Sequence, residues 1–253
     1  MKSVALPAQH GGWGFLFEPM LAGLILAPSW AGLFLSLSAF FVFLLHQPLK
    51  TALKDRLRGR RFARTALAER VALAYGAVAA IAFLAAHFAA EYAFWPPFLI
   101  AVPLAAVQFW GDIRNEGRTA AAEIAGALAF AGLGAMLVLV AGGSPLQAAL
   151  IWALLAARII PSILYVRARL RLSKGQPVDP RPSNAAHAVA LVGVLIAVWA
   201  AGLSPLPLIG SALLLVRAAL GLSRRHKPVP AKVIGFREVA YGALYALLIG
   251  LAV

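Results

Sequence analysis

The sequence has no cysteine and few charged residues. The missing cysteine excludes disulfides, thiolate metal ligands and cysteine nucleophiles. Charged residues make up 13% of the chain and hydrophobic residues 62%, whereas a soluble domain carries roughly a quarter charged residues. No HExxH, P-loop or GxSxG motif is present. Most of the protein surface must therefore face lipid, and no familiar catalytic signature names a reaction.

The charge that remains is strongly basic, with a formal net charge of +14. In a soluble protein such an excess would suggest nucleic acid. In a membrane protein it usually reports topology and contact with anionic lipid headgroups. We therefore expect membrane lipids, and no nucleic acid, as partners.

Long apolar runs predict an all-α fold, a polytopic transmembrane helical bundle of about nine spans in a single domain over residues 1–253. A span needs about 20 mostly apolar residues to cross a hydrocarbon core of about 30 Å. Turn compositions rich in Pro, Gly and Ser separate the runs. The expected spans are 12–28, 30–46, 68–89, 95–111, 119–141, 146–166, 185–202, 206–222 and 233–252.

Basic residues give the expected orientation. All 23 Lys and Arg residues fall at alternate connections or in the adjoining half of a helix. Because positive charge marks the cytoplasmic side, this pattern predicts an inside N-terminus and an outside C-terminus. We expect a multi-pass protein of the bacterial inner membrane. Function would then sit at the long internal connections 47–67, 167–184 and 223–232, of which 47–67 is either a basic amphipathic helix or a solvated loop.

Six ionisable residues fall inside the predicted spans, where charge is costly and needs a reason. Each lies roughly 8–13 Å from the cytoplasmic boundary at 1.5 Å per residue. Three acids balance three bases, which predicts an inward-opening polar cavity where the groups pair with each other or with a ligand. Ion pairs that merely join helices are the alternative. The six are Glu18, Glu123, Glu238, Arg158, Arg217 and Arg237.

A second polar cluster precedes the fifth span. If a helix already runs through it, Asp112 and Glu116 share a face at i, i+4. Carboxylates at this spacing can hold Mg²⁺ bridged to a phosphate. They equally resemble a helix N-terminus that complements its own dipole. Asp55 is a further candidate metal ligand, and the sequence leaves metal dependence open.

The opening segment is unusual for a first span, since His10 precedes Gly11, Gly12 and Gly14. Glycines allow a neighbour or a ligand to approach the backbone closely. His10 is a candidate proton-transfer group or phosphate donor.

Residues 9–14 (Gln-His-Gly-Gly-Trp-Gly), followed by Glu18-Pro19, resemble the opening of the YwiC-like family of bacterial membrane proteins. Residues 46–50 (His-Gln-Pro-Leu-Lys) and 114–118 (Arg-Asn-Glu-Gly-Arg) are also similar to that family. The resemblance covers essentially the whole chain and implies a membrane protein without naming an activity.

The architecture is more distantly similar to UbiA-type intramembrane prenyltransferases. That resemblance implies two Asp-rich motifs, after the second and sixth helices, that hold a prenyl diphosphate through Mg²⁺. Only Asp55 matches the acidic pattern here, and residues 165–171 are basic. Arginine and lysine would then have to bind the phosphate directly, which guanidinium geometry suits.

The leading hypothesis is a UbiA-like enzyme that acts on an isoprenoid or other anionic-headed lipid at the cytoplasmic face. Its candidate bases, metal ligands and proton donor are Glu18, Asp112, Glu116 and His10. Its candidate phosphate ligands are Lys50, Lys54, Arg158 and Arg167. A small proton-coupled transporter is the competing class, because intramembrane Glu and Arg also suit carriers. A non-catalytic membrane partner is the third.

Overall fold

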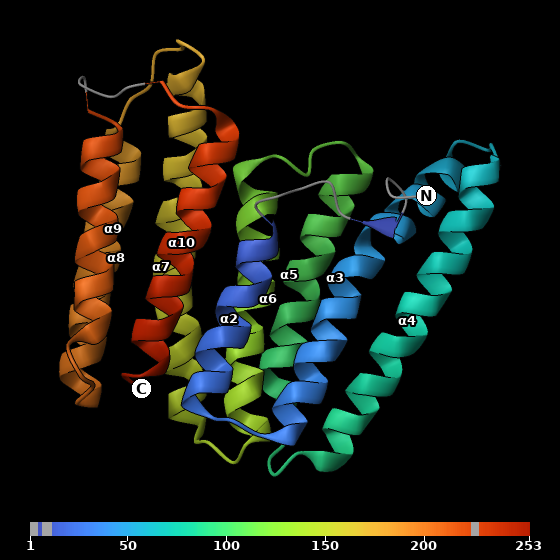
Figure 1. The fold of residues 1–253 in the computed structure, drawn as a ribbon, viewed down its shortest axis with the longest axis horizontal. Coiled ribbons are helices and arrows are strands. Elements are labelled where there is room, and N and C mark those ends of the chain that lie inside the picture. Colours follow the sequence, from blue (N-terminus) through green and yellow to red (C-terminus); the bar gives the residue numbers. More distant parts are fainter. Residues whose placement is uncertain (1–4, 7–11, 224–227) are drawn as a thin grey trace.

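The computed structural model describes residues 5–6, 12–223 and 228–253, and these form an all-helical bundle. The described part of the chain contains nine helices that run up and down between two ends (Figure 1). They are α2 (Gly12–Leu26), α3 (Trp30–Leu57), α4 (Ala63–Ala89), α5 (Trp95–Ile113), α6 (Ala120–Val140), α7 (Pro145–Ser173), α8 (Arg181–Ala201), α9 (Leu206–Gly221) and α10 (Ala231–Gly250).

Seven of these helices are long and apolar enough to cross a membrane, and α2 and α9 are shorter apolar helices beside them. Large apolar side chains point outward along the bundle; Trp199 on α8 is 85% exposed and Phe88 on α4 is 83% exposed. An apolar surface on helices of this length is typical of a bundle that faces lipid. The protein is therefore a multi-pass membrane protein, and the nine-span count stays a prediction for α2 and α9.

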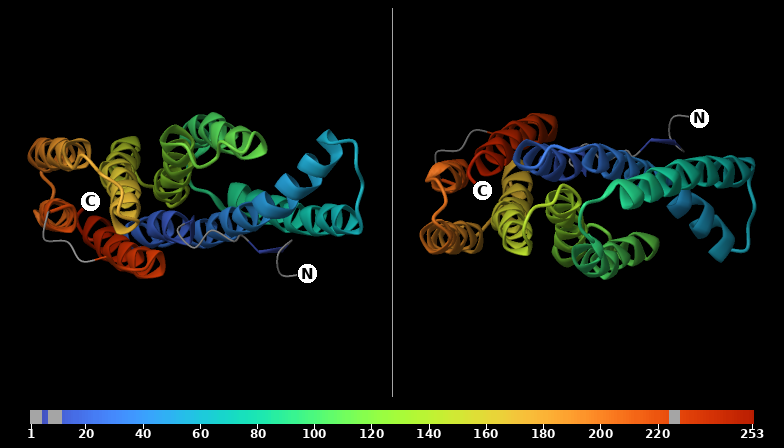
Figure 2. Two further views of the ribbon diagram at one scale, coloured as in Figure 1. Left: turned by 90° about the horizontal axis from the view of Figure 1, so that it is seen from above. Right: turned by 90° about the horizontal axis from the view of Figure 1, so that it is seen from below.

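The bundle is elongated, with α8 and α9 at one end of its long axis and α4 at the other (Figure 2). Helix α6 is the most enclosed, since every residue from Ala131 to Val140 is buried. Small residues allow its neighbours to pack closely. A Cβ atom at Gly134 would lie 2.9 Å from Leu155 Cδ1 on α7. Close backbone approach of this kind is the usual packing mode of helices in lipid.

Local sequence sets several helix starts. Ser29 Oγ accepts a hydrogen bond from Gly32 N at 3.0 Å, and Ser144 Oγ accepts one from Gln147 N at 3.2 Å. Gln147 Oε1 in turn accepts from Ser144 N at 3.0 Å, which completes a capping box.

The connections at the two ends of the bundle differ in charge. We call the end formed by 58–62, 114–119, 174–180, 222–223 and 228–230 the basic end, because Lys and Arg gather in these connections and in the adjoining helix halves. The opposite end is formed by 27–29, 90–94, 141–144 and 202–205, which hold neither residue. Helix α2 starts at the basic end and α10 finishes at the opposite end (Figure 1).

Two predicted long connections are shorter than expected. Residues 47–57 continue α3, and α4 begins at Ala63, so 47–67 forms neither a separate amphipathic helix nor a long loop. Similarly, α7 runs on to Ser173. Helix α3 has 28 residues, about 42 Å at 1.5 Å per residue, and must extend beyond a hydrocarbon core of about 30 Å.

Candidate functional site: a cationic cavity at the basic end

One face of α7 carries a polar stripe toward the C-terminal helices. Arg158, Ser162, Tyr165 and Arg169 follow one another at helical spacing and are all buried. Their contacts reach α2, α9 and α10, as described below. This polar stripe positions the side chains that α7 contributes to the site.

The deepest member of the stripe, Arg158, joins three helices. Arg158 Nη2 lies 3.0 Å from Glu18 Oε1 on α2 and donates to the backbone oxygen of Glu238 on α10, also at 3.0 Å. Arg158 and Glu18 are 2% and 4% exposed. A buried charge without a partner is far more costly than a buried pair. This pair therefore fixes how α2, α7 and α10 meet.

Helix α10 passes directly over this pair at Gly242. A Cβ atom at this position would overlap Glu18 Oε1 and lie 2.7 Å from Arg158 Nη2. Only glycine fits without a shift of the ion pair.

A second guanidinium, Arg217 on α9, organises the next layer toward the basic end. It forms an ion pair with Glu238, and its Nη2 lies 2.9 Å from His187 Nε2 on α8. Because arginine only donates, His187 Nε2 accepts, and His187 Nδ1–H then donates to Ser183 O at 2.8 Å. The guanidinium also lies 4.1 Å from the ring centroid of Tyr165.

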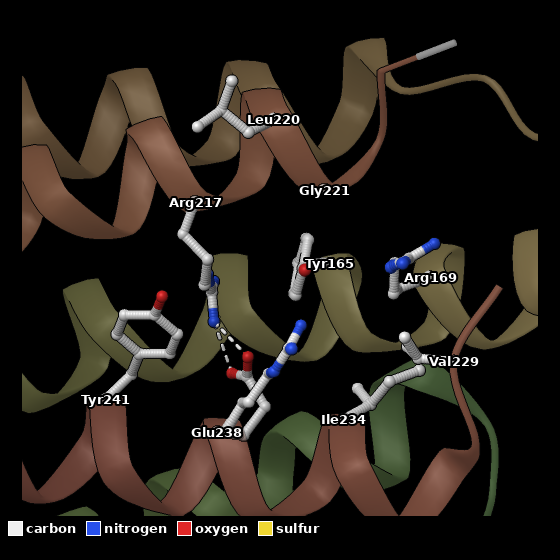
Figure 3. Close-up of a pocket in the computed structure, with 10 residues that line it drawn as sticks. Tyr165, Arg169, Arg217, Leu220, Gly221, Val229, Ile234, Glu238 and Tyr241 are labelled. Carbon is white, nitrogen blue, oxygen red and sulfur yellow. Dashed lines mark hydrogen bonds and ion pairs between the residues drawn. The ribbon is translucent and has the colours of Figure 1, made fainter. Parts of the chain in front are cut away.

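A cavity of about 450 Å³ adjoins this layer between α7, α9 and α10. The side chains of Tyr165, Arg217, Glu238 and Tyr241 converge on it from the three helices (Figure 3). Gly221 and Val229 place it at the basic end. The described residues that line it are Tyr165, Arg169, Arg217, Leu220, Gly221, Val229, Ile234, Arg237, Glu238 and Tyr241.

Three arginines and one glutamate line the cavity among the residues that the structure describes, so this lining is cationic. Glu238 is already paired with Arg217. Arg237 is exposed and forms no ion pair with the described residues. Guanidinium groups present forked donors that match phosphate and carboxylate oxygens. The cavity can therefore bind an anion, and its tyrosine rings can contact an apolar group next to that anion.

A separate polar cluster joins α3 to α5. Asp112 is buried, with its carboxylate oxygens 3.0 Å from His46 Nε2, 2.8 Å from Lys50 Nζ and 3.0 Å from Gln108 Nε2. One turn further along α3, Lys54 Nζ donates to Asn115 Oδ1 at 2.6 Å. Lys50 and Lys54, both predicted phosphate ligands, thus bind protein groups here.

Glu116 does not share a helix face with Asp112. We expected a shared face only if a helix ran through both residues. Helix α5 ends at Ile113, and Asn115 has a left-handed backbone with φ 65°. The chain turns so that Glu116 N donates to Gly111 O at 2.7 Å, and the Glu116 side chain is exposed. A turn therefore occupies the stretch where a continuous helix would have aligned the two carboxylates.

The remaining predicted residues form their own pairs. Arg167 Nη1 lies 2.8 Å from Glu123 Oε2 and donates to Arg118 O at 2.6 Å. Asp55 accepts from Arg64 and from Thr65 at the α3–α4 turn. Among the described residues, no group of three or more His, Asp or Glu side chains has the arrangement of a metal site.

The structure thus brings four predicted residues into one network, Glu18, Arg158, Arg217 and Glu238, with Arg237 on the adjoining cavity. Asp112 and Lys50 belong to another cluster, as do Glu123 and Arg167. His10 lies outside the described residues. Sequence reasoning missed Tyr165, Arg169, His187 and Tyr241 as site residues. The spacing of Arg158, Tyr165 and Arg169 was the available signal.

Comparison with known proteins gives a family and no closer relative. No curated protein matches the chain, and no solved structure matches it. The model of the family described as YwiC-like protein matches residues 6–139. These residues are more than half of the chain and run from before α2 to the last turn of α6. The chain therefore belongs to the YwiC-like protein family.

Proposed function

We propose that the protein binds an anionic-headed, lipid-soluble substrate in the cavity between α7, α9 and α10, at the cytoplasmic face of a bacterial inner membrane. A phosphorylated isoprenoid is the leading substrate class. The observation that carries the proposal is the convergence of Arg169, Arg217 and Arg237 on one cavity with a single glutamate. The cavity volume of about 450 Å³ is in the usual range of ligand pockets, about 300–1,000 Å³.

The position of the cavity suits a lipid headgroup. Arg217 lies four residues before the end of α9, about 6 Å along the helix axis. A phosphate at that depth stays near the membrane interface, while its hydrocarbon chain extends into the core. The positive-inside rule assigns the basic end to the cytoplasm. A headgroup entering from that side meets the exposed Arg237 first.

A UbiA-like transfer reaction is the enzymatic form of this proposal. In such a reaction the prenyl C–O bond breaks and diphosphate leaves with the bonding electrons. The prenyl carbon then bonds to the acceptor, which loses a proton to a base. The cavity arginines would stabilise the leaving group, as cationic clamps do in phosphoryl chemistry. Of the predicted bases, Glu18 is the one whose partner, Arg158, also contacts Glu238 in the cavity wall.

Native mass spectrometry of the protein, released gently from detergent, tests lipid binding. Arg237→Ala removes an exposed cavity arginine, and Lys232→Ala is the matched control, because Lys232 lies on the same helix outside the cavity lining. We expect a discrete anionic lipid on the wild type and on Lys232→Ala. Loss of a charge-assisted bond worth about 1.5–3 kcal/mol weakens binding about 10- to 100-fold. Equal lipid on all three proteins would contradict the proposal.

A proton-coupled transporter is the second candidate, favoured by one observation. Five polar side chains form a continuous series of contacts across α2, α7, α10, α9 and α8. In this order they are Glu18, Arg158, Glu238, Arg217 and His187. Chains of intramembrane ionisable groups are typical of proton relays. Proton flux into proteoliposomes, abolished by Glu18→Gln, would favour this function. Flux no greater than in empty liposomes would eliminate it.

A further inference from the structure

The short connection between α3 and α4 is rich in arginine. Five arginines fall among the nine residues 56–64, at the basic end. We call residues 55–65, which include the adjoining helix ends, the α3–α4 tip. The tip lies at the edge of the bundle, far along its long axis from α9 and the cationic cavity (Figure 2). None of its residues lines that cavity.

Backbone hydrogen bonds fix the apex of the tip. Gly59 has a left-handed backbone with φ 66°, and its N donates to Arg56 O at 2.9 Å. Arg60 N donates to Asp55 O at 3.2 Å. These two bonds form a Schellman motif, which ends a helix in a defined conformation. Arg58 and Arg60 therefore lie on either side of a turn whose backbone is held in place.

Two acids hold the other three arginines of the tip. Asp55 is 2% exposed and accepts from Arg64 Nε at 3.0 Å and from Arg64 Nη2 at 2.7 Å. Glu69 on α4 lies 2.7 Å from Arg56 Nη2 and 2.8 Å from Arg61 Nη2. The paired arginines thus join the end of α3 to the start of α4.

Arg58 and Arg60 are left without a counter-charge. Both side chains are exposed, and neither forms an ion pair with the described residues. The nearby acids Asp55 and Glu69 are already occupied by other arginines. Two guanidinium groups on a fixed turn are therefore available to an anion from outside the protein.

The length of α3 places the tip among lipid headgroups. Trp30 begins α3 at the opposite end and is 77% exposed, as is typical of tryptophan at a membrane interface. From there α3 has 28 residues, about 42 Å at 1.5 Å per residue. A bilayer with both headgroup regions is about 40–45 Å thick. On the tip, Leu57 and Phe62 are 66% and 43% exposed, and apolar side chains beside arginines suit this boundary.

We propose that the α3–α4 tip binds the phosphate group of an anionic phospholipid in the leaflet at the basic end. Arg58 and Arg60 bind the phosphate oxygens, because guanidinium groups present donors that match them. Leu57 and Phe62 contact the acyl chains next to the headgroup. A zwitterionic headgroup binds less well, because it brings a cation of its own to an uncompensated positive site. The site is separate from the cationic cavity and does not depend on the proposed function.

Photolabelling in nanodiscs tests the proposal. The probes are phosphatidylglycerol and phosphatidylcholine, each with a diazirine on one acyl chain close to the glycerol, at equal low fractions in otherwise identical nanodiscs. Peptide mass spectrometry locates the labelled residues. For the wild type we expect phosphatidylglycerol to label 55–65 at least about tenfold more than phosphatidylcholine, as two unbalanced arginines favour an anionic headgroup. Equal labelling by the two lipids, or no labelling of 55–65, would overturn the proposal.

A charge-matched variant separates a defined site from a general effect of positive charge. Arg58→Ala/Arg60→Ala should bring the labelling of the tip by the two lipids close to equal. Its unfolding temperature should match the wild type, because both side chains are exposed and unpaired. Arg171→Ala/Lys174→Ala removes two charges from the basic end outside the tip and should keep the wild-type preference within about twofold. Equal losses in the two double variants, or an undiminished preference in Arg58→Ala/Arg60→Ala, would refute the proposal.

Discussion

Glu18 and Arg158 form a buried ion pair at 3.0 Å, and this pair connects the helices of the family-matched region to the C-terminal helices. The nitrogen that contacts Glu18 also donates to the carbonyl of Glu238. The adjoining Glu238–Arg217 pair borders the cationic cavity. Packing at the centre of the bundle and the shape of the cavity therefore depend on the same few groups.

Removing one partner of the buried pair should be much worse than removing both. We expect Glu18→Leu to destabilise the protein by about 3–5 kcal/mol, because it leaves Arg158 buried without a counter-charge. The double variant Glu18→Leu/Arg158→Leu should lose much less than the sum of the two single losses. Thermal unfolding in mild detergent measures the cycle, and strictly additive losses would show that the two side chains are not coupled.

The close passage of α10 over the ion pair predicts a position-specific effect of an added methyl group. Gly242→Ala should destabilise the protein by about 1–3 kcal/mol, the usual cost of overpacking. Gly235→Ala on the same helix is the control, because nothing lies within 4 Å of a Cβ atom there. It should be neutral or stabilising by up to about 1 kcal/mol through helix propensity. Thermal unfolding in mild detergent compares the two variants. Equal effects on stability at both positions would be inconsistent with this packing.

The Asp112 cluster should stabilise the contact between α3 and α5. Asp112→Asn weakens charge-assisted hydrogen bonds from Lys50 and Gln108, so we expect a loss of about 1.5–3 kcal/mol. Glu116→Gln, at an exposed site in the adjacent turn, should change stability by less than about 0.5 kcal/mol. A fall in unfolding temperature confined to Asp112→Asn is the predicted result, and similar falls in both variants would count against the cluster.

Apolar run length located the helices well. The expected span 95–111 lies within Trp95–Ile113, and 119–141 agrees with Ala120–Val140 within one residue at each end. The run lengths failed where a helix leaves the hydrocarbon. Residues 47–57 are rich in Lys, Arg and Leu, which are good helix formers, so α3 continues past its apolar part.

The depth expected for the buried charges stays a prediction, and their partners could not be inferred from the sequence. Distance along a helix gives the height of Glu18 or Arg158 in the membrane, whereas the choice of partner depends on which helices are neighbours. That lateral order arises from packing between residues far apart in sequence, such as Gly242 over Arg158. Tyr165 and Tyr241 were missed because an aromatic residue in an apolar span does not reveal whether it faces lipid or a cavity.

The absence of cysteine makes the topology directly measurable. The substitutions Lys174→Cys and Ser204→Cys each introduce a single cysteine. Residue 174 lies in a connection at the basic end, and residue 204 lies in one at the opposite end. A membrane-impermeant maleimide should label Ser204→Cys in intact cells, and Lys174→Cys only in inside-out vesicles. The reverse pattern would place the basic end outside and contradict the proposed orientation.

Calorimetric titration of the purified protein with a short isoprenyl diphosphate, beside the matching isoprenyl alcohol, tests whether the cationic cavity binds an anionic headgroup. We expect the diphosphate to bind at the cationic cavity, and we expect Arg237→Ala to weaken this binding at least about tenfold. Lys232→Ala should leave its affinity unchanged, and Arg237→Ala should not affect the alcohol. Diphosphate affinities that are the same in the wild type and Arg237→Ala would contradict binding at the cationic cavity.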